Sequence, residues 1–167
     1  LAELHESTRE DRLGDISAWD RRWQQIAGLT PESEKPREIR GVRALDPEGR
    51  LVGAMAFTIG EGADHASRAF QIGHLVTATP DARAALWRFA LSYDLVGAVS
   101  AELQPLDEML PLLVRDRRAI TQTVRDHGWR RILDVPEALA GRSLAGPLGV
   151  RVRVTDPQGI ADGAWTL

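Results

Sequence analysis

The sequence contains no cysteine among its 167 residues. This absence excludes a disulfide framework, a thiolate nucleophile and a metal site with cysteine ligands. It is also compatible with a reducing compartment. We therefore expect a cytoplasmic location, with export by a route that needs no signal peptide as the alternative.

Long apolar runs and an excess of basic residues are also missing. No stretch approaches the roughly 18 consecutive apolar residues of a membrane span, and the sequence shows no signal-peptide pattern. The formal net charge is −3, and the small arginine pairs are interspersed with acids, which is typical of a solvated surface. We therefore expect no nucleic acid as the main partner and no membrane span.

The composition that remains is that of a globular protein, with 43% hydrophobic and 27% charged residues. A chain of this length holds one full domain, or one domain and part of another. It begins at Leu1 rather than at methionine, and its last four residues have the pattern of a strand without a following partner. We therefore expect the chain to be part of a longer protein.

The stretch of residues 71–111 organises the rest of the chain. Two short apolar runs, 72–76 and 95–101, have the composition of strands. Thr79 followed by Pro80 is typical of the start of a helix. Apolar side chains then recur at three- and four-residue spacing, at Ala82, Leu86, Phe89, Ala90 and Tyr93. The connection is long enough to cross over between two parallel strands, so we predict a parallel β-α-β unit.

Further hairpins and a short helix are predicted around this unit. Residues 39–46 and 51–59 flank a Pro-Glu-Gly-Arg turn and predict one hairpin. Residues 118–124 and 129–135, on either side of an Asp-His-Gly turn, predict a second hairpin. A short helix over 136–141 is opened by proline and closed by glycine.

Both ends of the chain also carry recognisable patterns. The first 28 residues are predicted to be mainly helical, with Ser17 and Asp20 resembling a capping box and Trp19 and Trp23 serving as packing anchors. Near the other end, valine alternates with polar residues over 150–155, which predicts a strand with one solvent-exposed face. A return strand is predicted to follow it.

Together these elements predict an α/β (α+β) fold with a mixed sheet, a central parallel β-α-β crossover and flanking helices. We divide the chain into an N-terminal helical segment and loop (1–35), a main domain (36–145) and the first hairpin of a further domain (146–167). The cut near Gly146 rests on a linker that contains glycine and proline.

Four blocks of the sequence, taken in order, resemble the Eis-type (enhanced intracellular survival) acetyltransferases. The blocks are TPDARAALWRFALSYDLV at 79–96, QPLDEMLPLLVRDRRAI at 104–120, WRRILDVPEALAGRSLA at 129–145 and VRVRVTDPQG at 150–159. The resemblance runs from about Trp19 to Leu167, which is nearly the whole chain. Several separate blocks in the family's order make it specific.

The resemblance implies a three-part parent protein. Its parts are an N-terminal GNAT acetyltransferase domain, a second GNAT-like domain and a C-terminal sterol-carrier-protein-like domain. Members of the family are typically hexameric and acetylate amines, aminoglycosides among them, from acetyl-CoA. This chain then resembles the second GNAT-like domain, with a mostly antiparallel sheet, plus the first hairpin of the third part. Its implied partners are the remaining domains, further copies of the protein and a small-molecule amine.

The resemblance implies acetyl-CoA as the cofactor of the parent protein, bound elsewhere than on this chain. A GNAT site holds the cofactor pyrophosphate on the amides of a glycine-rich turn that opens a helix, with the pattern Gln/Arg-x-x-Gly-x-Gly/Ala. The corresponding turn here, residues 78–83, has no glycine, and Pro80 removes one amide. Asp81 would repel a phosphate at close range. We therefore expect no cofactor on this chain.

Catalytic residues are likewise expected outside this chain. The family's general-acid tyrosine belongs to the first domain and its C-terminal carboxylate to the third, so Tyr93, the only tyrosine here, has no assigned role. His5, His65, His74 and His127 show no metal-ligand spacing. We expect no catalytic residue and no metal site, and we interpret His74 as a hydrogen-bonded histidine at the edge of the core and His127 as a turn residue.

Three acids are candidate site residues: Asp107, Glu108 and Asp156. Asp107 and Glu108 are neighbours in a turn, so their side chains point apart and a structural role is favoured over paired acid–base chemistry. Asp156 ends the strand that enters the third part, where a carboxylate would meet a substrate amine. It is the one candidate substrate-binding residue, against the alternative of a turn aspartate before proline.

Our interpretation of function is a non-catalytic GNAT-like segment of an Eis-type, acetyl-CoA-dependent amine N-acetyltransferase. We expect the segment to support the catalytic domain and the substrate cleft and to be inactive alone. One alternative is a free-standing GNAT acyltransferase with a divergent CoA loop. Another is a protein- or lipid-binding module whose contact surface is formed by a second helical stripe, Trp87 and Leu91, and the terminal strand.

Overall fold

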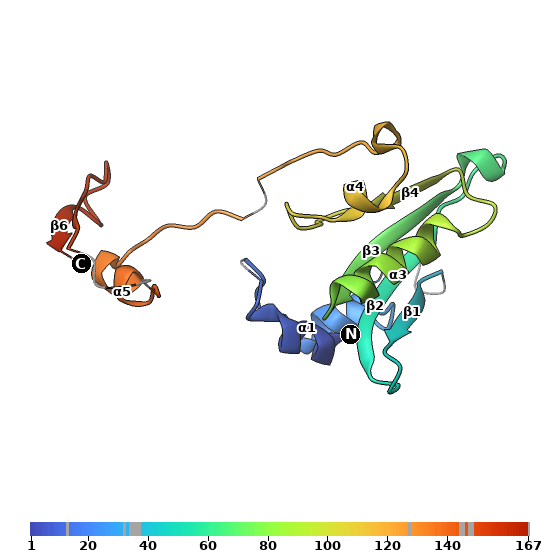
Figure 1. The fold of residues 1–167 in the computed structure, drawn as a ribbon, viewed down its shortest axis with the longest axis horizontal. Coiled ribbons are helices and arrows are strands. Elements are labelled where there is room, and N and C mark those ends of the chain that lie inside the picture. Colours follow the sequence, from blue (N-terminus) through green and yellow to red (C-terminus); the bar gives the residue numbers. More distant parts are fainter. Residues whose placement is uncertain are drawn as a thin grey trace. The chain divides into compact units, whose positions relative to one another are not determined.

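The computed structural model describes residues 1–12, 14–31, 33, 38–126, 128–143, 146 and 149–166. These residues form two compact units, Leu1–Gln122 and Thr123–Leu167. Figure 1 shows the helices and strands of both units. None of the helices in the described ranges is long and apolar enough to cross a bilayer.

The first unit is built on a mixed four-stranded sheet. Its strands lie in the order β1 (Arg40–Leu45), β2 (Leu51–Ile59), β3 (Ala69–Thr77) and β4 (Ala98–Ala101). The β1–β2 and β2–β3 pairs are antiparallel, and β3 pairs with β4 in parallel. Helix α3 (Pro80–Leu91) connects the two parallel strands. The predicted fold class is therefore confirmed, including its first hairpin and its parallel crossover.

The main core lies between α3 and one face of this sheet. Met55 and Phe57 of β2 and Phe70 of β3 pack there against Leu86 and Ala90 of α3. The rings of Phe57 and Phe70 stack with their centroids 4.2 Å apart. Burial of this apolar surface supplies most of the driving force for folding of the unit.

Helix α1 (Ala2–Arg9) covers the opposite face, where Leu4 packs on Ala54 and Val76. A bulge in β3 decides which side chains reach that face. Ala56 of β2 pairs with His74, whereas the next residue of β2 pairs with Ile72, so Gly73 is an extra residue. The extra residue lets His74 and Val76 lie on the α1 face, although Phe70 and Ile72 earlier in β3 pack on the α3 face.

The start of α2 (Asp20–Ile26) differs from the prediction. Trp19 precedes the helix and no side chain caps it. Asp20 is the first helical residue rather than the third, so Ser17 is too far from the free amides to act as the cap. Trp19 is 68% exposed and is not a packing anchor, whereas Trp23 packs its ring against other side chains.

The second predicted hairpin is wrong. After α4 (Leu110–Leu113) and a 3₁₀ turn (Arg117–Ala119), the described residues of 120–134 contain no strand. The apolar side chains that suggested the hairpin are exposed: Trp129 is 88%, Leu133 65% and Ile132 58% accessible. An isolated pair of strands is marginally stable unless it packs against a further layer, and these exposed side chains do not form such packing.

The second unit holds α5 (Val135–Ala140) and an antiparallel pair of strands, β5 (Arg151–Val154) and β6 (Gly163–Thr166). The predicted short helix and terminal hairpin are confirmed. Half of the expected linker, four of the eight residues 142–149, falls outside the described residues. The predicted domain cut near Gly146 lies inside this unit, since α5 groups with the hairpin, and the domain assignment stays a prediction.

Candidate functional site

The turn between β3 and α3 is the position at which a GNAT domain would hold phosphates, and the chain itself engages most of its amides. The amide of Ala78 donates to β2 at 2.8 Å. The amide of Ala82 donates to the Thr79 hydroxyl, and the amide of Arg83 donates to the Thr79 carbonyl, both at 3.2 Å. Pro80 has no N–H. The predicted helix start is confirmed, and the turn offers few free donors to an anion.

A buried ion pair lies beside the first two turns of α3. The side chains of Arg83 and Glu108 are only 10% and 6% exposed. The Nε of Arg83 donates to both carboxylate oxygens, at 2.9 and 3.2 Å, and its Nη2 donates to Oε2. The Trp87 indole N–H and the Leu110 amide both donate to Oε1, at 3.0 and 3.1 Å. Gln104 accepts a further bond from Arg83 at 2.7 Å.

This cluster, formed by Arg83, Trp87 and Glu108, lies where an α/β sheet would bind a ligand. The parallel strands pair only as far as Ile72 and Ala101, and β3 then continues without β4. In open α/β sheets, ligands bind in the crevice outside the carboxyl ends of such strands. Here the segment that follows β4 returns to α3 and places a carboxylate there.

The residues at this turn do not fit the phosphates of acetyl-CoA. Most amides that could bind a pyrophosphate are engaged, and the nearby guanidinium is neutralised by Glu108. Because the two charges neutralise each other, the pair presents no net positive charge to a phosphate. The turn can anchor the helix and hold the returning segment, but it lacks the donor set of a cofactor site.

Arg83 is the residue that sequence reasoning missed. The prediction that Asp107 and Glu108 have structural roles agrees with the geometry, because Asp107 is exposed and Glu108 is paired. The partner of Glu108 lies 25 residues earlier and leaves no local signal. One clue is that Arg83 and Trp87 are four residues apart and therefore lie on the same side of the helix. A cation beside a buried tryptophan needs an acidic partner, so a buried acid could have been expected there.

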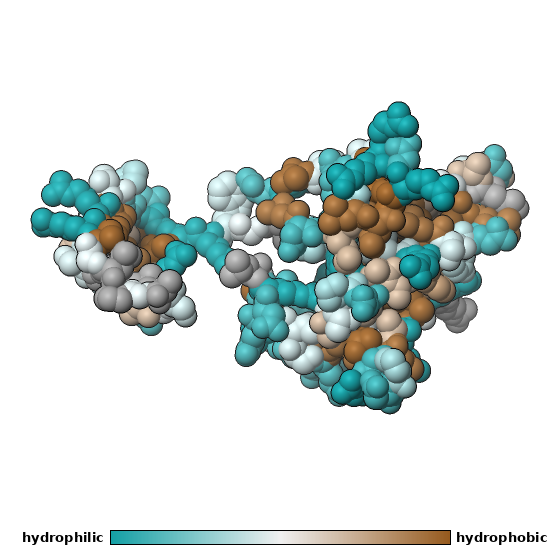
Figure 2. All heavy atoms as spheres, viewed as in Figure 1, coloured by the Kyte–Doolittle hydropathy of each residue, from teal (hydrophilic) through white to brown (hydrophobic). Residues whose placement is uncertain are grey.

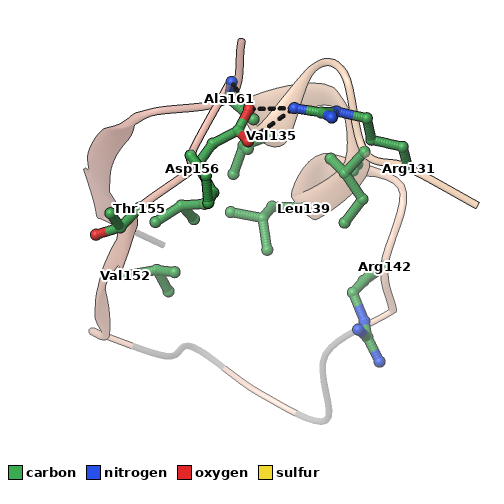
Figure 3. Close-up of a pocket in the computed structure, with 12 residues that line it drawn as sticks. Arg131, Val135, Leu139, Arg142, Val152, Thr155, Asp156 and Ala161 are labelled. Carbon is green, nitrogen blue, oxygen red and sulfur yellow. Dashed lines mark hydrogen bonds and ion pairs between the residues drawn. The ribbon is translucent and has the colours of Figure 1, made fainter. Parts of the chain in front are cut away.

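Asp156 organises the loop between β5 and β6. Its carboxylate accepts backbone bonds from Gln158, Ile160 and Ala161, at 3.1, 2.9 and 3.0 Å. Arg131 binds the same carboxylate, as Figure 3 shows. Hydrogen bonds from the Gln158 and Ala161 amides, assisted by Arg131, lower the pKa of Asp156 to about 2. The carboxylate is therefore engaged within its own loop, and its role as a substrate-binding residue stays a prediction.

A hollow of about 400 Å³ lies beside Asp156, within the second unit. Val135 and Leu139 of α5 line one side and Val152 of β5 the other, with Arg142 further along (Figure 3). The lining is mainly apolar, and its charged groups are those of Arg131, Arg142 and Asp156. Such a surface can accept an apolar side chain or a small apolar group.

The histidines in the described part of the chain do not form a metal site. His74 lies at the edge of the core as predicted, but its Nε2 is buried without a hydrogen-bond partner. Its ring contacts Trp23, and the ring of His5 lies 6.3 Å away. Burial first, and then the positive charges of His5 and Arg22, lower the pKa of His74 to about 4. No group of three potential ligands could hold a metal in the described part of the chain, and His127 lies outside that part.

Tyr93 has a packing role. Its ring lies 5.1 Å from that of Phe70, and its hydroxyl accepts a bond from Arg40 at 3.0 Å. The hydroxyl is therefore tied to β1 rather than presented to a substrate.

An apolar groove of about 560 Å³ lies on the α1 side of the sheet. Small residues of β1 and β2, namely Gly41, Ala54 and Ala56, line its base, and Trp23 and Leu29 stand beside them. The groove carries no constellation that suggests chemistry.

Comparison with known proteins identifies the class to which this fold belongs. The family model described as "Acetyltransferase (GNAT) domain" matches residues 14–152. The chain therefore belongs to the GNAT acetyltransferase domain family.

Two N-acetyltransferases are among the relatives that the chain resembles in sequence. An N-acetyltransferase of Streptomyces griseus, described as uncharacterized, is 30% identical over 172 residues, which cover 99% of this chain and 41% of that protein. The N-acetyltransferase Eis of Mycobacterium tuberculosis is 38% identical over 80 residues, covering 47% of this chain and 20% of that protein. The chain thus spans about two fifths of the length of the Streptomyces relative it matches.

The crystal structure of Eis1 from Mycobacterium abscessus has the same fold. It superposes with a TM-score of 0.67 at 24% sequence identity, covering 100% of this chain and 44% of that one. The expected likeness to the Eis type is supported at the level of family and fold.

Proposed function

We propose that this chain is the GNAT-like segment of an Eis-type N-acetyltransferase and that it does not itself bind acetyl-CoA. The observation that carries the proposal is the closed crevice at the start of α3. Most of the turn amides donate to other groups of the chain, and Glu108 occupies the side-chain donors beside them. A GNAT fold without a usable phosphate site is what a supporting domain requires, since its catalytic neighbour holds the cofactor.

The parent protein, on this proposal, transfers an acetyl group from acetyl-CoA to a small-molecule amine of the aminoglycoside type. That reaction needs a base for the amine proton and an acid for the leaving thiolate. We assign both groups to the remaining parts of the parent protein. The β5–β6 hairpin would begin a sterol-carrier-protein-like domain, and Asp156 would lie at its entry near the substrate.

Exposed apolar side chains around α4 support a role in contacts. Leu103, Leu106 and Leu112 are 70%, 88% and 72% accessible. Figure 2 shows hydrophobic residues gathered on the face of the first unit over the part of the view that carries the α4 and β4 labels. Apolar surface of this kind marks interaction sites. We propose that it meets the remaining domains of the parent or a further copy of it.

An acetyl-transfer assay on the isolated chain tests the proposal. Release of free CoA can be followed with a thiol reagent, and the chain contributes no background because it has no cysteine. We expect no release above the buffer rate with acetyl-CoA and a panel of amines, aminoglycosides included. Amine-dependent release that saturates with acetyl-CoA would instead establish the rival function, a free-standing GNAT enzyme with a divergent cofactor loop.

A further inference from the structure

We propose that Arg83, Trp87 and the amide of Leu110 form a carboxylate-binding site, and that Glu108 fills this site in cis and thereby locks the crevice beside α3. The inference goes beyond the proposed function, because it concerns a ligand class and holds whatever the parent protein catalyses.

The donors converge on a single carboxylate from two directions. Arg83 supplies Nε and Nη2 from the side of α3, and Trp87 adds its indole N–H one turn later. The Leu110 amide approaches Oε1 from the start of α4. Both carboxylate oxygens are therefore bound, which is the arrangement of a receptor for a planar anion rather than of a single surface contact.

Burial of the ion pair fixes the position of the segment that carries Glu108. The two charged side chains are almost completely removed from water. A buried ion pair seldom stabilises a protein more than apolar residues of the same volume would, because both charges lose their hydration. Its benefit here is geometric, since it fixes where the segment after β4 returns to α3. Gln104 supports the same position by accepting from Arg83.

Removal of the Glu108 side chain should leave a site with the size and donors of a small carboxylate. In Glu108→Ala the guanidinium and the indole N–H face a void that acetate or formate can enter. We expect the melting temperature of this variant to lie several degrees below that of the wild type. Acetate should restore at least half of the loss in a saturable manner, relative to chloride at equal ionic strength.

Asp107→Ala is the matched control, because Asp107 is the exposed neighbour in the same turn. Neither this variant nor the wild type should respond to acetate more than to chloride. An equal response of all three proteins to acetate would overturn the proposal. So would a Glu108→Ala variant that stays unfolded at every acetate concentration.

A second measurement uses the wild-type chain alone. If the lock is closed, the Trp87 indole N–H and the Leu110 amide should exchange with deuterium as slowly as amides of β2 and β3. Exchange at the rate of an exposed loop would contradict a closed lock. Binding of acetyl-CoA to the wild type would overturn the proposed function without affecting rescue by acetate, so the two failures can be told apart.

Discussion

At the scale of single residues, His74 is the group whose protonation state is most closely tied to folding. Its ring lies between β3, α1 and α2, close to the charges of His5 and Arg22, with Asp15 acting in the opposite direction. Its Nε2 has no acceptor or donor to compensate for burial. The neutral form is therefore the one that fits the folded chain.

This predicts a specific pH dependence of stability. The pKa of His74 is about 4 in the folded chain and about 6.5 when unfolded. Between these values the unfolded chain binds more protons, so the free energy of unfolding falls as the pH drops from about 6.5 to about 4, by up to about 3 kcal/mol. Urea titrations of the wild type and His74→Leu should diverge across this window. Parallel curves would contradict the assignment.

Thr79 gives a second prediction at the residue scale. Its hydroxyl accepts from the Ala82 amide at the start of α3. Thr79→Ala should cost about 1 kcal/mol of stability because that amide loses its partner. Thr79→Ser keeps the oxygen and is the control. Chemical denaturation of both variants checks the prediction, and an equal loss for the two would show that the cap contributes nothing.

At the scale of elements, two glycines in the first unit make a matched pair. A Cβ on Gly97 would lie 1.9 Å from the carbonyl oxygen of Ala66, because two backbone segments meet there. A Cβ on Gly41 in β1 would meet nothing closer than 3.8 Å. Gly97→Ala should therefore lose about 1–3 kcal/mol through overpacking, whereas Gly41→Ala should be neutral or slightly stabilising. Thermal melts of the two variants test this prediction, and equal melting temperatures would contradict it.

The β5–β6 loop depends on Asp156. Because backbone bonds hold its pKa at about 2, against 3.8 for the free carboxyl, its contribution is complete above pH 3.8 and is lost as the pH falls through 2. Asp156→Ala should therefore open the hairpin, with much faster amide exchange in β5 and β6, and Asp156→Asn should do so less because it keeps one oxygen. Unchanged protection in Asp156→Ala would rule out this role.

The elements that sequence reasoning predicted correctly are those that local chemistry specifies. The capped start of α3 at Thr79, the hairpin turn in which the Asp46 side chain accepts from Arg50, and the start of α5 at Asp134 each depend on residues a few positions apart. The hairpin over 118–135 failed because two candidate strands and a turn motif between them do not provide a surface to bury them. The Arg83–Glu108 pair could not be predicted, since it joins segments that only the folded crossover brings together.

At the scale of the whole molecule, two observations have to be reconciled. The chain belongs to the GNAT family, whose members bind a phosphate-containing cofactor at the start of this helix, but here that crevice is closed. The family model extends over 14–152, and the Eis1 fold covers the complete chain. The turn that should bind phosphate nevertheless has most of its amides engaged and an ion pair beside it. The role that we propose, a GNAT-like domain for support and contacts within a longer protein, would account for both observations.

Calorimetric titration of the folded chain with acetyl-CoA tests this account most directly. We predict no heat beyond dilution, with folding verified on the same sample, because the turn at 78–83 offers few free donors to the pyrophosphate. One-to-one binding in the micromolar range would contradict the account, and the turn and the cluster around Glu108 would then have to open to form a cofactor site.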